Sequence, residues 1–271
     1  MPKELSPKQN IDAGNAWYID DQFAKQYSRA GPRAVIEARW KVFESVVSAY
    51  LARISSTNPV YPIRILDAGC GDGINLLGLS QMIERNKWPA ELFGVDYNPL
   101  RVERVEKFAH VRLVRESRLE SLQFPDGWFS IVICNQVLEH IHDEAAVLKE
   151  LKRVVSQEGF LIIGVPNEGC LLGRLRNNFF QRSILRTTDH VNFYTAEQLE
   201  ALLNSEDFRI SKIVRMGFFM PHLLLHYAVS SFSVGRAMLR YLGKAFPSQC
   251  AELLTISTKQ KKGNPMECRN K

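Results

Sequence analysis

The most constraining feature of this sequence is a glycine-rich turn that directly follows a short apolar run. A buried β-strand is predicted at residues 63–68, and Gly69, Gly71 and Gly73 follow it at alternate positions. Glycines at the end of a buried strand allow the backbone to turn sharply and to approach a ligand closely. The pattern therefore predicts a nucleotide-like ligand at the carboxyl end of this strand.

Strand-like and helix-like apolar segments alternate through the rest of the chain. Six further strands are predicted at 91–96, 111–114, 129–134, 160–165, 208–215 and 252–258, and helices at 76–84, 100–108, 143–155 and 196–204. A turn at 157–159 precedes the fifth strand. This alternation predicts an α/β fold with a doubly wound, seven-stranded, mainly parallel sheet. The last two strands lack a regular helical crossover, which indicates an antiparallel edge strand.

The chain is expected to divide into three parts. They are an N-terminal helical cap at 1–60, a core domain at 61–258 with helical inserts at about 168–190 and 217–247, and a basic flexible tail at 259–271. Apolar residues recur at helical spacing from Trp17 to Ile54, with a break at Gly31 and Pro32, and residues 1–15 are polar and expected to fray.

The net charge of +6 is concentrated in a few segments. The tail has a net charge of +4, and residues 170–186 and 217–246 hold seven arginines and lysines without an acid. Because the remainder is net acidic, the chain lacks the uniform basic surface that grips a polyanion, and a nucleic-acid partner is not expected.

The cysteines and the apolar runs bear on compartment and metal content. The five cysteines are scattered, and no pair has zinc-ligand spacing, so we interpret them as reduced thiols and predict no metal site. No apolar run follows the N-terminal lysines, and no stretch of about twenty apolar residues exists. A cytoplasmic protein is expected, and a peripheral membrane contact through 217–246 is left open. The oligomeric state is not predicted.

The residues around the glycine turn discriminate between ligands. The dinucleotide fingerprint requires glycine at position 74, where this chain has Ile74. Asp67 and Asp72 flank the turn, and two carboxylates would repel a pyrophosphate. A ligand with a sulfonium and an ammonium group suits this environment better, so the pattern favours S-adenosylmethionine over a nicotinamide cofactor, whose dehydrogenases remain a weaker alternative.

A second acid follows the second predicted strand. The Asp96 carboxylate can accept both hydroxyls of a ribose, and the Tyr97 ring can lie on an adenine. The alternative is a helix-capping aspartate beside a core tyrosine. The neighbouring glycine turn argues against this alternative.

Several motifs together resemble the class I S-adenosylmethionine-dependent methyltransferases. The resemblance rests on Ile65–Gly73 (ILDAGCGDG), Asp96, the segments 124–129 and 137–140, Val165-Pro166-Asn167, and residues 190–199. It covers about residues 61–208, and the most similar branch contains the ubiquinone-pathway O-methyltransferases. A Rossmann-like methyltransferase sheet is therefore expected.

The resemblance implies roles for residues along the expected cofactor site. Asp67, Ala68, Gly69, Cys70, Gly71 and Asn135 would surround the methionine part, with Asp67 near its ammonium group, and Arg118 or Leu119 would lie by the adenine. Relatives commonly carry an acid where this chain has Arg118, which cannot accept a hydrogen bond. Adenine recognition would then rest on the Leu119 backbone, or on Glu116 or Glu120.

Two residues of the N-terminal helices complete the expected cofactor site. Tyr27, with Phe23, looks like the aromatic pair that precedes the core in relatives, and Arg39 is placed to reach the cofactor's carboxylate. The product of the reaction would be S-adenosylhomocysteine.

Histidines are the candidates for catalysis, since methyl transfer needs a base only when the acceptor must lose a proton. His140 follows the fourth strand and His190 precedes a helix; His142 is a weaker candidate. Alternatively, each histidine satisfies backbone groups in a loop. The Asn-Pro-Pro-aromatic tetrad of base and glutamine methylases is absent after the fourth strand, and Cys134 follows Ile133 rather than proline, so neither amide nor cytosine C5 methylation is indicated.

The two basic inserts bear on the acceptor. We interpret them as a lid over the sheet, as a pocket for an acidic, partly apolar acceptor near Arg174, Arg176, Arg236 or Arg240, or as a membrane-surface helix. The hypothesis is a methyltransferase that acts on a small or lipid-like acidic acceptor, with O-methylation favoured over N-methylation. The alternative is an inactive methyltransferase-fold module that binds a protein partner or a membrane surface.

Overall fold

The computed structural model describes residues 21–55, 62–105, 111–184 and 188–260. The predictions for residues 1–15, for the break after Ser55 and for the tail beyond 260 lie outside these residues. The proposed division of the chain into cap, core and tail stays a prediction for the same reason. None of the helices in the described ranges has the length and apolar composition to cross a membrane.

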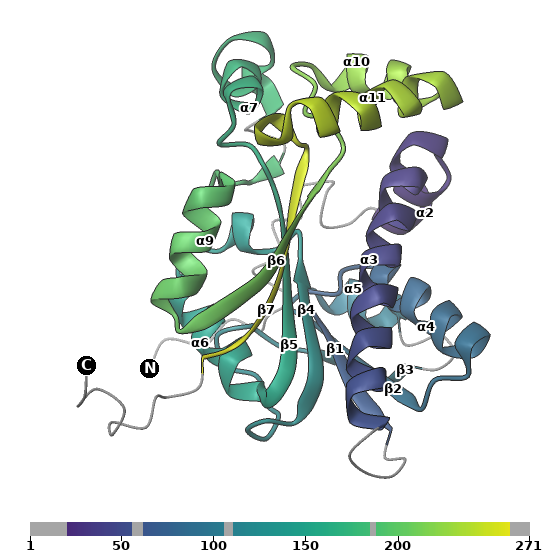
Figure 1. Cartoon of the computed structure of the whole chain (residues 1–271), viewed down its shortest axis with the longest axis vertical. Coiled ribbons are helices and arrows are strands. Elements are labelled where there is room, and N and C mark those ends of the chain that lie inside the picture. The colour runs from purple at the N-terminus through teal and green to yellow at the C-terminus, as the bar shows by residue number, and fades with distance from the viewer. Residues whose placement is uncertain (1–20, 56–61, 106–110, 185–187, 261–271) are drawn as a thin grey trace, which may run out of the picture.

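Seven strands form one twisted sheet in the order β3-β2-β1-β4-β5-β7-β6 (Figure 1). Their bounds are β1 Ile63–Ala68, β2 Ala90–Asp96, β3 Val111–Glu116, β4 Phe129–Asn135, β5 Val155–Pro166, β6 Phe208–Met216 and β7 Glu252–Lys259. The first five strands pair in parallel, and β7 lies antiparallel to both β5 and β6. The predicted α/β class with an antiparallel arrangement at this edge is confirmed.

Helices cover both faces of the sheet, and each face has its own hydrophobic core (Figure 1). On one face lie α3 (Ala30–Ser55), α4 (Ile74–Asn86) and α5 (Pro99–Val105); on the other lie α6 (Glu144–Val154) and α9 (Ala196–Ser205). The central strands β1 and β4 are almost fully buried, as parallel strands covered on both faces must be.

Local sequence signals place the ends of α6 and α9 as predicted. Asp143 caps α6 by accepting a hydrogen bond from the Ala146 amide at 3.0 Å. Thr195 and Gln198 form a capping box at the start of α9. Each helix buries one apolar stripe against the sheet, because its apolar residues recur at helical spacing.

Two predicted boundaries are corrected. The strand β5 begins at Val155 rather than 160, because Val155 pairs with Phe129 and the residues before Phe160 form an irregularity within the strand instead of a separate turn. The N-terminal break lies before Gly31 and Pro32, since α2 (Gln22–Tyr27) ends earlier and both residues fall in the first turn of α3, where proline is tolerated. Helix α5 is described as far as Val105.

A group of short helices lies beyond the carboxyl ends of the parallel strands, at the top of Figure 1. It consists of α7 (Leu171–Leu175), η3 (Arg176–Phe180), η4 (Arg182–Ile184), α10 (Leu223–Ser230), α11 (Ser233–Ala245) and η5 (Pro247–Gln249). A further turn, η2 (Leu138–His140), follows β4. The predicted helical inserts therefore stand over the edge of the sheet where the glycine turn lies.

Candidate functional site

The glycine turn after β1 has the backbone conformation that only glycine adopts easily. Gly69, Gly71 and Gly73 have φ angles of 77°, 52° and 80°. The Gly69 and Cys70 amides donate to the Val95 carbonyl at 2.8 and 2.9 Å, which ties the turn to β2. A Cβ at position 69 would lie 2.5 Å from Val137 Cγ2. The turn is thus held against the segment that follows β4, without room for a side chain.

Asp96 ends β2 and connects it to the same turn. Its Oδ2 accepts from the Gly71 amide and its Oδ1 from the Asn98 amide, both at 2.9 Å. Burial raises the pKa of this carboxyl, while these backbone hydrogen bonds counteract part of that rise. Because a carboxylate oxygen can accept more than one hydrogen bond, Asp96 retains acceptor capacity toward the cavity that it lines.

A cavity of about 260 Å³ opens beside Asp96 and Tyr97. Leu119 forms part of its buried wall, and Gly69 and Val137 lie at its inner end. The Arg118 side chain is 80% exposed and lies 3.5 Å from Glu120. Of the two acids considered as partners for an adenine, Glu120 lines this cavity and Glu116 is not among its lining residues.

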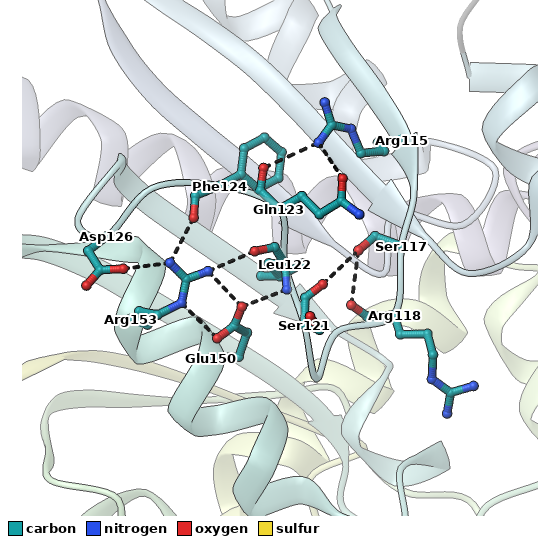
Figure 2. A network of polar contacts seen from close by, with 10 residues as sticks. All are labelled: Arg115, Ser117, Arg118, Ser121, Leu122, Gln123, Phe124, Asp126, Glu150 and Arg153. Atoms are coloured by element: carbon teal, nitrogen blue, oxygen red, sulfur yellow. Dashed lines mark hydrogen bonds and ion pairs between the residues drawn. The ribbon is translucent and has the colours of Figure 1, made fainter.

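The loop that carries Leu119 is fixed by Arg153 of α6 (Figure 2). The Arg153 guanidinium donates to the carbonyls of Leu122 and Phe124, each at 2.8 Å, and to the carboxylate of Glu150. Glu150 in turn accepts from the Leu122 amide at 2.6 Å. Arg153 therefore fixes a loop that has no regular secondary structure.

A second cavity of about 570 Å³ lies on the other side of the glycine turn. It is lined by the turn itself, by Asn75 and Asn135, and by a group of ionisable side chains from several loops. A third cavity, of about 540 Å³, extends under α10 and α11 and shares Arg39, Gln136, Pro166 and two further lining residues with the second. The three spaces form one region around Gln136, which lines them all.

Asp67 is fully buried behind this region. Its Oδ1 lies 3.5 Å from Asn75 Nδ2, and its Oδ2 has no hydrogen-bond partner. Burial, helped by the nearby charge of Asp96, raises the pKa of Asp67 to about 7. Ala68 is also fully buried, and neither residue is among those that line the cavities. Asn75 and the glycines form the cavity wall here.

Arg39 lines the second and third cavities but is already paired. Its Nε and Nη2 donate to the two carboxylate oxygens of Glu252 at 2.7 and 2.9 Å. With its amide oriented to satisfy both groups, Asn135 donates to Glu252 Oε1 at 3.3 Å and accepts from Arg39 Nη1 at 3.2 Å. Arg39 therefore enters the site as half of an ion pair.

His140 and His190 lie against each other in the second cavity, although 50 residues separate them in the chain. Their ring centroids are 4.8 Å apart in an edge-to-face arrangement. His140 Nδ1 lies 3.3 Å from the Asp189 carbonyl, and His190 Nδ1 lies 3.0 Å from Glu168 Oε2. Burial, together with His190, lowers the pKa of His140 to about 4. His142, the weaker candidate, is exposed.

Three functional candidates were missed by the sequence reasoning. Glu139 is 1% exposed, neither of its carboxylate oxygens has a partner, and burial raises its pKa to about 8. Glu168 pairs with Arg176 as well as with His190. Gln136 adopts a φ of 58°, which is strained for a residue other than glycine. The only available signal was their position beside motifs already recognised.

Other predicted residues lie outside the cavities or are partnered. Tyr27 stacks with Phe23 and packs on Trp40 at a centroid distance of 5.6 Å, and it is not among the residues lining the three cavities. Arg176 is buried against Glu168 and the Phe219 ring. Arg236 donates to the carbonyls of Ser230 and Ser231 at the end of α10, which leaves the Arg236–Arg240 pair only partly available to a ligand.

Comparisons with known proteins identify the family of this chain. The profile of the methyltransferase domain family matches residues 40–213. The chain is 30% identical over 149 residues to an uncharacterized methyltransferase, YcgJ, of Bacillus subtilis (52% of this chain, 55% of the relative). It is 28% identical over 171 residues to the ubiquinone biosynthesis O-methyltransferase of Azorhizobium caulinodans (60% and 65%). The alignments with the first relatives span about a third to two thirds of their length.

Solved structures share the fold at lower identity. The plantazolicin methyltransferase BpumL, determined with S-adenosylhomocysteine, has a TM-score of 0.59 at 18% identity, covering 91% of this chain and 93% of its own. A possible histamine N-methyltransferase of Thermotoga maritima has a TM-score of 0.56 at 19% identity (90% and 99%).

Proposed function

The chain belongs to the methyltransferase domain family, and from this premise we propose that it transfers the methyl group of S-adenosylmethionine to a small or lipid-like acceptor with an acidic group. The main support is the glycine turn. The Gly69 and Cys70 amides bind β2, and the Gly71 amide donates to the buried carboxylate of Asp96. Such a turn offers close backbone approach, and Asp96 offers hydrogen-bond acceptors to a ribose.

The residues at the turn fit this cofactor. A Cβ at Gly69 would fill the space where the turn meets Val137, and the backbone there is open to a ligand only because the side chain is absent. The carboxyls of Asp67 and Asp96 are buried, and one oxygen of Asp67 has no hydrogen-bond partner, which suits a ligand that carries an ammonium and a sulfonium charge. Gly69, Cys70, Gly71 and Asn135 would hold the amino-acid part, and Tyr97, Leu119 and the Arg118–Glu120 pair would border the adenine.

The cavity under α10 and α11 supports an acidic acceptor. Its lining includes Arg39, Lys41, Arg236 and Arg240, against the acids Glu37 and Glu252. Among the arginines of this lining, Glu252 compensates Arg39 and carbonyls engage Arg236, so the side chain of Arg240 is the one we assign to the acceptor's acidic group. An Arg240→Glu variant should raise the KM for an acidic acceptor at least tenfold with little change in cofactor affinity; an unchanged KM would exclude this assignment.

O-methylation is favoured by the histidine pair, because a hydroxyl acceptor must lose its proton. Glu168 fixes the Nδ1 side of His190 and leaves Nε2 as the nitrogen able to take a proton. His140 is the second candidate, and its lowered pKa makes it a weak base.

Titration calorimetry with S-adenosylmethionine tests the cofactor assignment. The wild-type protein should bind one equivalent, and Asp96→Ala should bind about 30- to 150-fold more weakly, since a charge-assisted hydrogen-bond pair contributes about 2–3 kcal/mol. Asp143→Ala removes a carboxylate that caps α6 and serves as a control that keeps cofactor affinity. No binding by the folded wild-type protein would leave the inactive-module alternative.

A peripheral membrane contact is proposed for the same end of the molecule. Helices α10 and α11 expose Phe232 (70%), Val234 (79%) and Tyr241 (71%), and residues 217–246 carry three basic side chains and no acid. Exposed apolar side chains combined with basic ones complement an anionic bilayer surface. The lid over the cavity would then rest on the phase that holds a lipid-like acceptor.

Sedimentation with phosphatidylcholine vesicles, with and without phosphatidylserine, tests this contact. Binding should require the anionic lipid and fall at least fivefold in a Phe232→Gln/Val234→Gln variant. Leu100→Gln, an exposed apolar site on α5, is the matched control. No vesicle binding, or equal binding by all variants, would exclude the contact.

A further inference from the structure

A cluster of three side chains in the second cavity has the composition of a metal site. One carboxylate oxygen of Glu139 and one ring nitrogen each of His140 and His190 lie within 4.8 Å of one another. Two histidines and one carboxylate, with open positions beside them, form a common set of ligands for divalent transition metals. All three residues line the 570 Å³ cavity.

The hydrogen bonds around the two histidines match those of metal ligands. Nδ1 of His190 is bonded to the Glu168 carboxylate at 3.0 Å, and Nδ1 of His140 lies 3.3 Å from the Asp189 carbonyl. Histidines that bind a metal through one nitrogen usually donate the other N–H to a carboxylate or a backbone carbonyl, which sets the ring orientation. Both rings are thus held with Nε2 left for a ligand.

The Glu139 carboxyl provides a second, independent observation. Both of its oxygens are buried and have no hydrogen-bond partner. A buried carboxyl without partners is costly, and it either keeps its proton or binds a cation. Arg39, whose charge acts on Glu139, is already paired with Glu252.

We propose that Glu139, His140 and His190 bind one divalent transition-metal ion, with zinc, cobalt or manganese as the class of ion. Nitrogen ligands favour these ions over magnesium and calcium. Three protein ligands leave coordination positions open toward the cavity, where an oxygen of the acceptor can bind. This role in acceptor binding rests on the proposed methyl transfer, whereas the metal site itself does not.

The metal would change how the histidines act. Bound to the ion through Nε2, they would be ligands, and the ion would lower the pKa of the acceptor hydroxyl so that its proton passes to water instead of to a histidine. The two arrangements differ in their dependence on metal. A histidine base remains active after a chelator has removed the metal, whereas an acceptor that needs the metal is no longer methylated.

Cobalt titration of untagged, chelator-treated full-length protein tests the site. The wild-type protein should bind one equivalent of Co²⁺, with visible absorption bands and two paramagnetically shifted imidazole N–H signals. Glu139→Gln and His190→Asn should each weaken binding at least tenfold, whereas His142→Ala, which removes an exposed histidine two residues from His140, should bind as the wild type does.

The same samples separate this inference from the proposed function. S-adenosylmethionine binding is measured on each variant by calorimetry. Cofactor binding without a cobalt signal from histidines in the wild-type protein would overturn the metal site alone. Cobalt binding without cofactor binding would overturn the methyltransferase proposal alone. Because the two shifted N–H signals come from the wild-type protein, an unfolded variant would not remove the test.

Discussion

Arg39 of α3 and Glu252 of β7 form a two-pronged ion pair that joins the N-terminal helix to the last strand. Both contacts are short, at 2.7 and 2.9 Å, and both side chains are largely buried, at 11% and 6% exposure. Through Asn135 the pair also reaches the carboxyl end of β4. It therefore couples three elements that are distant in sequence at the wall of the two larger cavities.

Breaking this pair should destabilise the protein strongly. In Glu252→Gln the Arg39 guanidinium would be left buried without its counter-charge, and the free energy of unfolding should fall by about 3 kcal/mol. Chemical denaturation measures the change. Asp207→Asn, which breaks the exposed Lys152–Asp207 pair, should cost less than about 1 kcal/mol. Equal effects of the two substitutions would show that burial does not govern the Arg39 pair.

Gly69→Ala should weaken cofactor binding in addition to destabilising the fold. Its φ of 77° is unfavourable for alanine, and the new Cβ would lie 2.5 Å from Val137 Cγ2. We expect S-adenosylmethionine affinity to fall at least tenfold by calorimetry. Gly127→Ala is the matched control, since Gly127 has a similar φ of 62° but its Cβ would only come within 3.7 Å of Ser156 Cα. It should cost about 1 kcal/mol of stability and leave cofactor affinity intact.

Asp67 should make the stability of the cofactor-free protein depend on pH. Its folded-state pKa of about 7 lies above the ordinary value, so the folded protein keeps this proton after the unfolded chain has lost it. The contribution of Asp67 to stability should therefore fall as pH rises from about 4 to about 7 and then level off. In Asp67→Asn this fall should be missing, a difference on the order of 4 kcal/mol in denaturation curves across that range. Parallel pH profiles of variant and wild type would contradict the assignment.

Arg153 should control the loop beside Tyr97 and Leu119. Arg153→Ala removes donors to two loop carbonyls and to Glu150, and should lower stability by about 1–3 kcal/mol while weakening S-adenosylmethionine binding (Figure 2). Arg115→Ala removes longer hydrogen bonds to Gln123, at 3.3 Å, and a contact with the Phe124 ring, and should change both quantities little. Thermal unfolding and calorimetry check the pair; loss of stability without loss of binding would separate the loop from the site.

The features that sequence predicted well are those fixed by local chemistry. The glycine turn, the starts of α6 and α9, and Asp96 at the end of β2 depend on residues close together in the chain. The alternation of apolar segments was sufficient to predict the α/β class, because the apolar residues of each segment recur with the period of either a strand or a helix.

The features that sequence could not supply depend on distant partners. The placement of Glu168 against His190, and of Glu252 against Arg39, follows from how loops and strands meet in space. Arg176 and Arg236 were predicted to lie near an acidic acceptor, yet a buried carboxylate and two backbone carbonyls engage them. The burial of Glu139 likewise has no periodic signal in the sequence, because Glu139 lies in the short turn η2 and not on a regular helix or strand.

The position of β7 between β5 and β6 has a consequence for biosynthesis. Because β6 is bonded to the sheet through β7, it cannot dock while the nascent chain still ends before Glu252. Ribosome-bound intermediates would hold a five-stranded sheet with an unpaired edge at β5, and Arg39 would lack its counter-ion until the final strand emerges. Emergence of β7 from the ribosome, rather than any earlier event, thus closes the wall of the cavity.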